Sequence, residues 1–330
     1  MRDTPAPAAD LRGLTGVVRN PMSKRNRTGR SEAWWRDIDD PSVICAEPAS
    51  PDDLVDVLSD FARRGVTLLV VDGGDGTVRE VLSALPAAYG ERPPALAVLA
   101  SGTTNLIAAD VGAGRADPST VAMLRQIARG EAQATRIERR ATLEVSWPDG
   151  SRPPVVGMFV GACAFTRATD LSVSLVREGR VEEGAGVAVT LLSVMAKTLA
   201  GSEREQWLAG ATLGIGADGG MIEVAPRFLF LSTTLNKLML GLWPFWGEGL
   251  GAIRYLDIAA SPKRLAVALP ALLRGKPRPW MPDAGYRSGT ADTLDLLLND
   301  RFVIDGEFFE PGEHGRIRLG AGPTIDFVVP

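Results

Sequence analysis

The stretch that decides the fold is Val66-Thr-Leu-Leu-Val-Val-Asp-Gly-Gly-Asp-Gly-Thr77. Its first six residues are an almost wholly apolar run with the length of a buried strand. The glycines cannot continue that strand, and residues 78–85 resume with apolar side chains at helical spacing. Residues 95–111 repeat the order of strand, turn and helix start. Two adjacent βα units predict a Rossmann-like parallel sheet.

The sequence before and after this stretch extends the same domain. Leu14–Arg19 has the character of a strand, and Ser50-Pro-Asp-Asp53 supplies a capping serine, a proline at the first helical position and acids in the first turn of a helix. Residues 118–128 predict a further helix. We therefore expect a mobile tail at residues 1–13 and an α/β domain at residues 14–134.

The pattern of the sequence changes near residue 135. From there on, many short β-like runs are separated by turn signals such as Trp147-Pro-Asp-Gly150. Helical spacing returns only at residues 186–199 and 262–274. We predict that residues 135–330 form a mainly antiparallel β-sandwich domain.

Composition excludes some classes of partner. The 330 residues include 36 Lys and Arg against 40 Asp and Glu, so a net charge of −4 gives no positive field to hold nucleic acid. The two cysteines, Cys45 and Cys163, show no C-x-x-C spacing and are too few for a disulfide framework. The longest nearly uncharged apolar stretch, residues 187–196, is shorter than the roughly 20 residues that span a bilayer. We therefore expect a soluble, cytoplasmic protein without a nucleic-acid partner.

The glycine turn has the chemistry of a phosphate-binding site. Glycine permits a positive φ and lets another group approach the main chain closely, and Gly73, Gly74 and Gly76 provide this at three of four positions. The amides of the turn and of the following helix favour an anion at the carboxyl edge of the sheet. Asp75 would repel phosphate unless a cation lies between them, so we expect it to hold or orient Mg²⁺. Thr77 adds a hydroxyl at the start of the helix.

Four motifs, in this order along the chain, resemble the signatures of the diacylglycerol kinase catalytic domain family. That family also includes bacterial lipid kinases and sphingosine kinases. The motifs cover nearly the whole chain. They are Asn20-Pro-Met-Ser23, Gly73-Gly-Asp-Gly-Thr77 followed by Glu80 and Val81, Ser101-Gly-Thr-Thr-Asn105, and Ile304-Asp-Gly-Glu307.

The resemblance implies an N-terminal nucleotide-binding domain of the NAD kinase and diacylglycerol kinase type, a C-terminal β-sandwich for the lipid acceptor, and catalysis in the cleft between them. It also implies that Glu80 supports a metal network. By motif match, the residues expected to line the ATP site are Asn20, Gly73, Gly74, Asp75, Gly76, Thr77, Gly102 and Thr103.

The implied reaction is transfer of the γ-phosphate of ATP to the hydroxyl of diacylglycerol or a similar long-chain lipid alcohol. Such a transfer needs a base near the hydroxyl proton and a cation on the phosphate oxygens. By the resemblance, Glu307 is the candidate general base, and Asp75 acts through Mg²⁺. Taken alone, Asp305-Gly-Glu307 is more typical of a hairpin turn between two short strands.

The chain departs from the family pattern at two places. Small bacterial members usually carry a structural metal site, whose aspartates precede a strand resembling Ile253–Asp257. Residues 245–252 lack those aspartates, so we expect the metal site to be lost. The opening loop has Lys24-Arg-Asn-Arg27 where many members have a glycine-led turn.

Two segments of the second half suggest where an acceptor could lie. Residues 238–246 are rich in apolar and aromatic side chains, which fit either an ordinary core or a loop at an acyl-chain pocket or a membrane interface. Basic residues surround the apolar helix at residues 262–274, as a solvated basic face or as a contact for anionic lipid. The expected partners are a lipid alcohol and, transiently, the anionic surface at the inner face of the membrane. The sequence leaves open whether the protein forms a homodimer. The basic residues are Lys263, Arg264, Arg274, Lys276 and Arg278.

Two other functions compete with a lipid kinase. A soluble-metabolite kinase of the NAD kinase type also carries Gly-Gly-Asp-Gly-Thr, but Asn20-Pro21 and Asp305-Gly-Glu307 argue against it. A nucleotide-binding sensor or pseudokinase would explain the missing metal aspartates and the altered opening loop. Retention of both Asp75 and Glu307 argues against that alternative.

Overall fold

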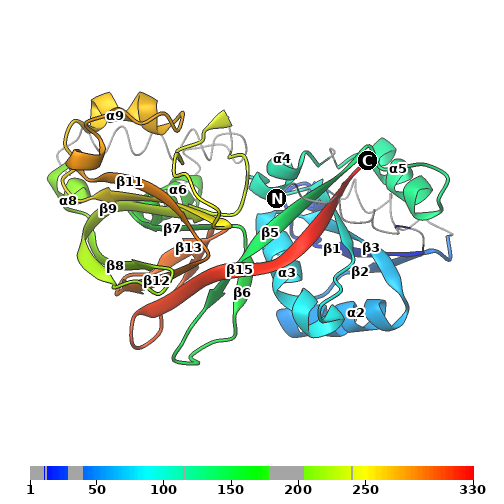
Figure 1. The fold of residues 1–330 in the computed structure, drawn as a ribbon. Helices are drawn as coiled ribbons and strands as arrows, with labels where there is room; N and C mark the ends of the chain where they lie inside the picture. Colours follow the sequence, from blue (N-terminus) through cyan, green and yellow to red (C-terminus); the bar gives the residue numbers. More distant parts are fainter. Residues whose placement is uncertain (1–10, 12, 29–39, 114–115, 178–203, 239–240) are drawn as a thin grey trace. The chain divides into compact units, whose positions relative to one another are not determined.

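The chain divides into two compact units, which are described separately below (Figure 1). The first unit is Met1–Arg140 with Pro323–Pro330, and the second is Ala141–Gly322. The computed structural model describes residues 11, 13–28, 40–113, 116–177, 204–238 and 241–330.

The expected domain bounds, 14–134 and 135–330, stay a prediction. The two compact units differ from them at the C-terminus, because residues 323–330 belong to the first unit. The helix expected at residues 186–199 and most of the tail expected at residues 1–13 lie outside the described residues.

The first unit is built on a parallel sheet. Its strands are β1 (Leu14–Arg19), β2 (Val43–Ala46), β3 (Val66–Gly73), β4 (Ala95–Ala100) and the end of β15 (Arg316–Val329). β1 lies between β2 and β3, β3 pairs with β4, and all three pairings are parallel. β15 adds beside β4, in parallel at Phe327 and Leu96. The parallel sheet expected from the two βα units is therefore confirmed.

Helices cover both faces of this sheet, with α2 on one side and α5 on the other (Figure 1). α2 (Pro51–Arg63) begins as expected, because the side chain of Ser50 accepts a hydrogen bond from the Asp53 N–H at 3.2 Å. α5 (Pro118–Ala128) packs its apolar residues against a cluster that includes Val17 and Leu68 of the sheet. Burial on both faces explains why the strands are continuous apolar runs.

The second unit is mainly antiparallel. β9 pairs with β7, β8 and β10, β12 pairs with β8 and β15, and β13 pairs with β7 and β14, all antiparallel. With the parallel sheet of the first unit, this confirms the expected fold class. The strands are β5 (Arg136–Ser146), β6 (Val155–Gly157), β7 (Phe159–Cys163), β8 (Ala211–Ala217), β9 (Glu223–Thr233), β10 (Ile253–Ala259), β11 (Tyr286–Ala291), β12 (Thr293–Leu298), β13 (Phe302–Ile304) and β14 (Glu307–Phe309).

The helices of the second unit are only partly foreseen by the sequence. They are α6 (Ala164–Arg177), α8 (Arg204–Ala209) and α9 (Leu265–Leu272), with a short 3-10 turn at Pro282–Ala284. The segment at 262–274 predicts α9, whereas α6 and α8 are not predicted. In α6 the threonines and valines are typical of strands by propensity, so tertiary packing decides its conformation.

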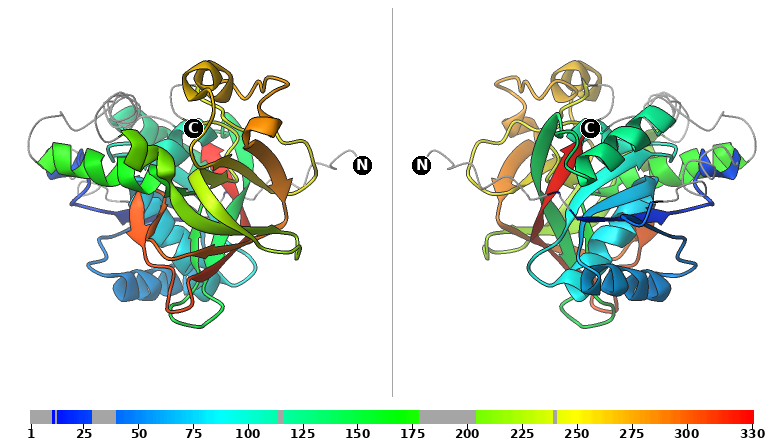
Figure 2. Two further views of the ribbon diagram at one scale, coloured as in Figure 1. Left: turned by 90° about the vertical axis from the view of Figure 1, so that its left-hand side faces the viewer. Right: turned by 90° about the vertical axis from the view of Figure 1, so that its right-hand side faces the viewer.

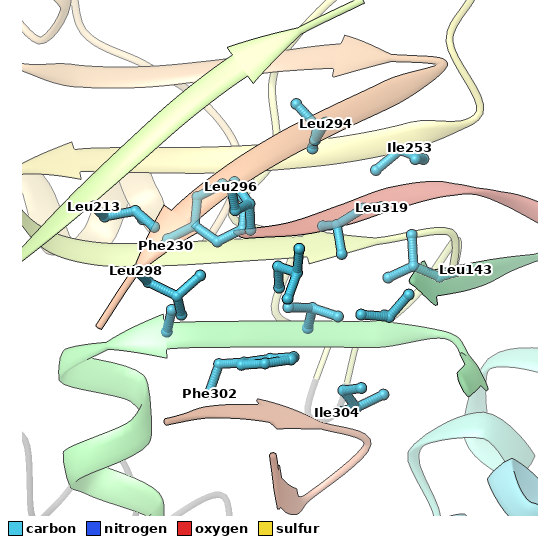
Figure 3. Packing of buried hydrophobic residues seen from close by; sticks show 14 of the residues in the cluster. Leu143, Leu213, Phe230, Ile253, Leu294, Leu296, Leu298, Phe302, Ile304 and Leu319 are labelled. Atoms are coloured by element: carbon cyan, nitrogen blue, oxygen red, sulfur yellow. The ribbon is translucent and has the colours of Figure 1, made fainter. Parts of the chain in front are cut away.

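A core of apolar side chains fixes the strands of the second unit (Figure 3). Leu213, Phe230 and Leu296 are completely buried there, and so are Phe302 and Ile304 of β13. Because both ends of β13 are anchored in this core, the hairpin that β13 forms with β14 starts from a fixed strand.

Candidate active site

The carboxyl ends of β1, β3 and β4 meet at one edge of the parallel sheet. Arg19, the last residue of β1, lies opposite Asp72 of β3, and Gly73 lies opposite Ala100, the last residue of β4. Residues that follow parallel neighbouring strands converge at this edge, which is where ligands bind in open α/β sheets. The motifs brought together here are Asn20–Ser23, Gly73–Thr77 and Ser101–Asn105.

Asp72 is completely buried at this edge. The Ser101 hydroxyl donates a hydrogen bond to its Oδ1 at 2.6 Å, and the Asn26 Nδ2 donates to the same oxygen at 3.2 Å. The Arg19 Nε lies 3.9 Å from its Oδ2. A buried carboxylate is tolerated only when it is paired and hydrogen-bonded. Asp72 therefore ties the opening loop, the end of β1 and the turn after β4 to one point.

Asn20 links the opening loop to the glycine turn. Its backbone N–H donates to the Asp72 carbonyl at 3.0 Å, and its Nδ2 donates to the Thr77 Oγ1 at 2.9 Å. Its Oδ1 accepts from the Met22 N–H at 2.9 Å. Because the Thr77 oxygen already accepts from Asn20, the hydroxyl proton of Thr77 is directed to another acceptor. Two residues expected at the ATP site are thus in direct contact.

The glycines are needed for close approach and not for a positive φ. β3 runs to Gly73 and α3 (Asp75–Tyr89) begins two residues later, so Gly74 alone makes the turn, with φ −95°. None of the three glycines of the motif has a positive φ, so that part of the sequence interpretation is wrong. A Cβ on Gly73 would lie 2.5 Å from the Cβ of Thr77, and one on Gly102 would lie 2.4 Å from the Cα of Gly74. The two glycine turns therefore touch through their main chains.

We expect Gly102→Ala to damage this contact. The added methyl would lie 2.4 Å from the Cα of Gly74, so the two turns would have to separate. Overpacking of this kind costs about 1–3 kcal/mol, and nucleotide affinity should fall with it. Denaturant unfolding and nucleotide titration measure the two effects. Gly320→Ala is the control, because its Cβ would meet no atom within 4 Å. Equal behaviour of the two variants would contradict the close-approach role.

The N-terminus of α3 is open to an anion. Its N-cap is Gly74, which forms no side-chain capping hydrogen bond, and the first helical bond runs from the Val78 N–H to the Gly74 carbonyl at 3.0 Å. The N–H groups of the first helical turn have no intrahelical acceptor, and the helix dipole adds partial positive charge. Residues 75–77 therefore offer the donor arrangement that binds phosphate.

The N-terminus of the neighbouring helix, α4 (Leu106–Val111), is already capped. Asp75 Oδ2 accepts from the Leu106 N–H at 2.9 Å, and Asp75 Oδ1 accepts from the Ile107 N–H at 3.0 Å. Burial raises the pKa of the Asp75 carboxyl, and these amide donors oppose the rise. Asp75 thus connects the glycine turn to α4. Of the two helix starts, only that of α3 remains for phosphate.

The turn that precedes α4 is closed on itself. The Gly102 N–H donates to the Asn105 Oδ1, and the Asn105 Nδ2 donates to the Gly102 carbonyl, both at 2.9 Å. Asn105 has a φ of 52°, which asparagine tolerates better than most residues. Thr103 lies within this turn and is partly buried. Gly102 thus lies next to the glycine turn, and the roles of Gly102 and Thr103 at an ATP site stay predictions.

The described residues do not form a ready site for Mg²⁺. Both oxygens of Asp75 accept backbone hydrogen bonds, and Glu80 lies on the α3 surface beside Arg79, with 3.6 Å between Glu80 Oε1 and the guanidinium. Within the part of the chain that is described, no three His, Cys, Asp or Glu side chains cluster as metal ligands would. The metal roles of Asp75 and Glu80 stay predictions, and any Mg²⁺ fits better as part of a metal–nucleotide substrate.

Asp305, Gly306 and Glu307 lie in the second unit as a two-residue hairpin turn and the start of β14. Asp305 and Gly306 have φ values of 46° and 91°, as a tight turn between antiparallel strands requires. The carboxylate of Asp305 accepts from the N–H groups of Met158 and Phe159 at 3.0 and 2.9 Å. Glu307 is exposed at the first position of β14. Asp305 therefore holds the hairpin, and Glu307 is the member of the motif that is presented to solvent.

Sequence reasoning assigned no role to several polar residues at the sheet edge. The sequence motifs give Asp72 no function, and Arg19, Asn26 and Ser101 are not among the predicted site residues. Arg19 and Asp72 lie at the ends of buried apolar strands, and Ser101 follows one directly. A polar residue at the carboxyl end of a buried strand is a signal that could have found three of the four.

The fold and this edge of the sheet define the class of protein. It has an α/β unit with a glycine-lined turn of the kind that binds phosphate, and this unit is joined to a mainly antiparallel unit. Residues 20–139 match the family model of the diacylglycerol kinase catalytic domain. The resemblance inferred from the motifs is thereby confirmed over this part of the chain. No curated protein matches the chain in sequence.

Solved structures share this fold over nearly the whole chain. A diacylglycerol kinase from Bacillus anthracis str. Sterne is 13% identical with a TM-score of 0.58, and the match covers 96% of this chain and 97% of that one. A proposed diacylglycerol kinase from the same organism is 15% identical with a TM-score of 0.63, over 99% and 98% of the two chains. At this identity the likeness establishes the fold.

Proposed function

We propose that the protein is an ATP-dependent lipid kinase that phosphorylates the hydroxyl of diacylglycerol or a similar long-chain alcohol. The observation that carries the proposal is the uncapped, glycine-lined N-terminus of α3, within the segment that matches the diacylglycerol kinase catalytic domain. An anion-binding helix start in a segment of this family is best explained by the phosphates of a nucleotide. The choice of a lipid acceptor rests on the family resemblance.

The chemistry assigned to the chain is positioning and proton removal. The N–H groups of residues 75–77 would hold phosphate oxygens, and the Thr77 hydroxyl, oriented by Asn20, would donate to one of them. The acceptor oxygen forms a bond to the γ-phosphorus as the bond between that phosphorus and ADP breaks. In the proposal, Glu307 takes the proton of the acceptor hydroxyl. When bound with the nucleotide, Mg²⁺ would neutralise charge on the phosphate oxygens.

The experiment is a transfer assay with γ-labelled ATP, Mg²⁺ and a panel of lipid alcohols, NAD and sugars. Label that moves into an organic extract, and that depends on diacylglycerol or a related alcohol, supports the proposal. Transfer to NAD alone would assign the soluble-metabolite alternative. Tight nucleotide binding without transfer to any acceptor would favour a sensor. The hydrogen bonds from backbone N–H groups to Asp75 also support that alternative.

A further inference from the structure

Helix α9 exposes an apolar face. Its sequence, Leu-Ala-Val-Ala-Leu-Pro-Ala-Leu, is apolar on every side, and helices of that kind are normally buried. Only Ala268, Ala271 and Leu272 are buried, whereas Ala266, Val267 and Pro270 are exposed, Val267 to 49%. In Figures 1 and 2, α9 lies at the periphery of the second unit, outside its strands.

Basic side chains flank this helix along the chain, and the next acid is Asp283. Residues 261–280 contain five basic residues and no Asp or Glu, in a chain whose net charge is −4. All five of these basic residues are exposed. The segment therefore carries a local charge opposite to that of the chain as a whole, around an apolar centre. The five are Lys263, Arg264, Arg274, Lys276 and Arg278.

Packing holds Lys263 and Arg264 close to Trp280, at the end of residues 261–280. The Arg264 guanidinium lies 5.5 Å from the ring centre of Trp280, and that ring packs edge-on against Tyr286 at 5.9 Å. The Tyr286 hydroxyl donates to the Lys263 carbonyl at 2.8 Å. The start of α9 and the chain near Arg278 are thus held together as one basic surface.

Aromatic side chains support the other end of the helix. The Trp243 N–H donates to the Leu273 carbonyl at 3.0 Å, and its ring lies edge-on to Phe245 at 5.2 Å. The Arg254 guanidinium lies 5.5 Å from the Trp243 ring centre. Trp243 is partly buried and lies next to the C-terminus of α9. Tryptophan in this position suits the boundary between water and lipid.

We propose that α9 and its five flanking basic residues, here called the α9 surface, bind an anionic phospholipid bilayer. Apolar contact alone would fit a second copy of the chain, and basic charge alone would fit nucleic acid. The combination of an exposed apolar helix face with a basic frame fits the headgroup region of an anionic membrane. No helix in the described ranges has the length and hydropathy to cross a bilayer, so this is binding at the surface. The inference rests on the proposed function only in naming the membrane as the source of the acceptor.

The first test removes charge from the surface. The triple variant Arg274→Gln/Lys276→Gln/Arg278→Gln is compared with the unchanged protein. Binding to phosphatidylglycerol–phosphatidylcholine vesicles is measured by sedimentation, without nucleotide. Each basic residue near such a membrane is worth about fivefold in affinity, so three should cost about 100-fold. The control is Arg63→Gln/Arg64→Gln/Arg92→Gln, which makes the same change in net charge at exposed positions of the first unit. The control should bind vesicles like the unchanged protein, and equal loss in both variants would overturn the proposal.

The second test changes the apolar face. Val267→Asp should weaken vesicle binding, and Val267→Trp should strengthen it, because residue 267 lies on the exposed side of α9. Preserved unfolding transitions show that the variants fold. Binding to pure phosphatidylcholine as tight as to anionic vesicles would overturn the charge argument. If the unchanged protein were a dimer, Val267→Asp were a monomer and both bound vesicles equally well, the surface would belong to an interface with a second copy of the chain. Competition by nucleic acid at equal ionic strength would assign it to that partner instead.

A third measurement separates this inference from the proposed function. Kinase activity is measured with a short-chain, water-dispersed diacylglycerol and with the long-chain lipid in vesicles. The triple variant of the α9 surface should retain turnover on the short-chain substrate and lose about 100-fold at limiting vesicle concentration. If no acceptor is phosphorylated, the proposed function fails, while vesicle binding still decides the α9 surface. If activity is present but vesicle binding is absent, only the α9 surface is wrong.

Discussion

Glu307→Gln is expected to lower kcat by about 10²- to 10⁴-fold and to leave the unfolding transition unchanged. A positioned general base contributes an acceleration of this size, and glutamine keeps the shape of the side chain but cannot take a proton. Stability should not change, because Glu307 is exposed at the start of β14 while Asp305 and the buried residues of β13 hold the hairpin. The measurement is steady-state kinetics of phosphate transfer with denaturant unfolding of the same samples.

The matched control for this variant is Glu310→Gln. Glu310 is also exposed, three residues further along, and its recorded contact is through its backbone carbonyl, which accepts from the Trp147 Nε1 at 2.9 Å. It makes the same change in charge without touching the motif. If Glu307→Gln and Glu310→Gln have the same kcat, the Asp-Gly-Glu motif is a hairpin turn and Glu307 is not the base. A rise in the KM for the acceptor with kcat unchanged would assign Glu307 to acceptor binding.

The sequence predicts the first unit well because its signals are local. A buried apolar run and a serine cap before proline each determine their own neighbourhood. Leu14–Arg19, Pro118–Ala128 and Ala95–Ala100 form as expected. The glycine turn is placed correctly, and of the two reasons that the sequence gives for its glycines, close approach holds and a positive φ does not. The group that approaches Gly74 is Gly102, and this partner, far away in the chain, is not revealed by any local pattern.

The second unit is less predictable for the same reason. Residues 317–319 and 324–329 read as two short strands, but pairing with β12 at one end and with β4 at the other joins them in one, β15. In the Asp-Gly-Glu motif, the sequence allows both a hairpin and a catalytic residue, and the structure shows that the hairpin forms with Glu307 beside it. The role of a side chain follows from what surrounds it in space, which a motif alone does not contain.

Asp75→Ala is expected to destabilise the first unit by about 1–3 kcal/mol, whether or not Mg²⁺ is present. The change leaves the N–H groups of Leu106 and Ile107 without their carboxylate acceptor. α4 has only six residues, and its N-cap, Asn105, forms no side-chain capping bond, so nothing local replaces Asp75. Denaturant unfolding in EDTA measures the loss. The control is Asp52→Ala, which removes an exposed acid from the first turn of α2 and should cost a few tenths of a kcal/mol.

The pH dependence of the same variant tests the cause. Burial raises the pKa of Asp75, so the folded state binds a proton more tightly than the unfolded chain, whose aspartate pKa is about 3.9. The contribution of Asp75 to stability therefore falls as the pH rises above about 4, and the gap between the unchanged protein and Asp75→Ala should narrow towards neutral pH. An unchanged stability in EDTA, with loss only of metal–nucleotide binding, would instead make Asp75 a metal ligand.

The C-terminal end of α4 is also held in place, so the effect of Asp75→Ala on α4 bears on function. Asp110 of α4 is completely buried and pairs with Arg140 of β5, with 2.8 Å between Nε and Oδ2. α4 is thus held at one end by the glycine turn and at the other by β5, which continues into the second unit after Arg140. Asp75→Ala should therefore release α4 from the glycine turn while the Asp110 pair stays intact. Amide hydrogen exchange should then rise at Leu106 and Ile107, and less at Asp110 and Val111.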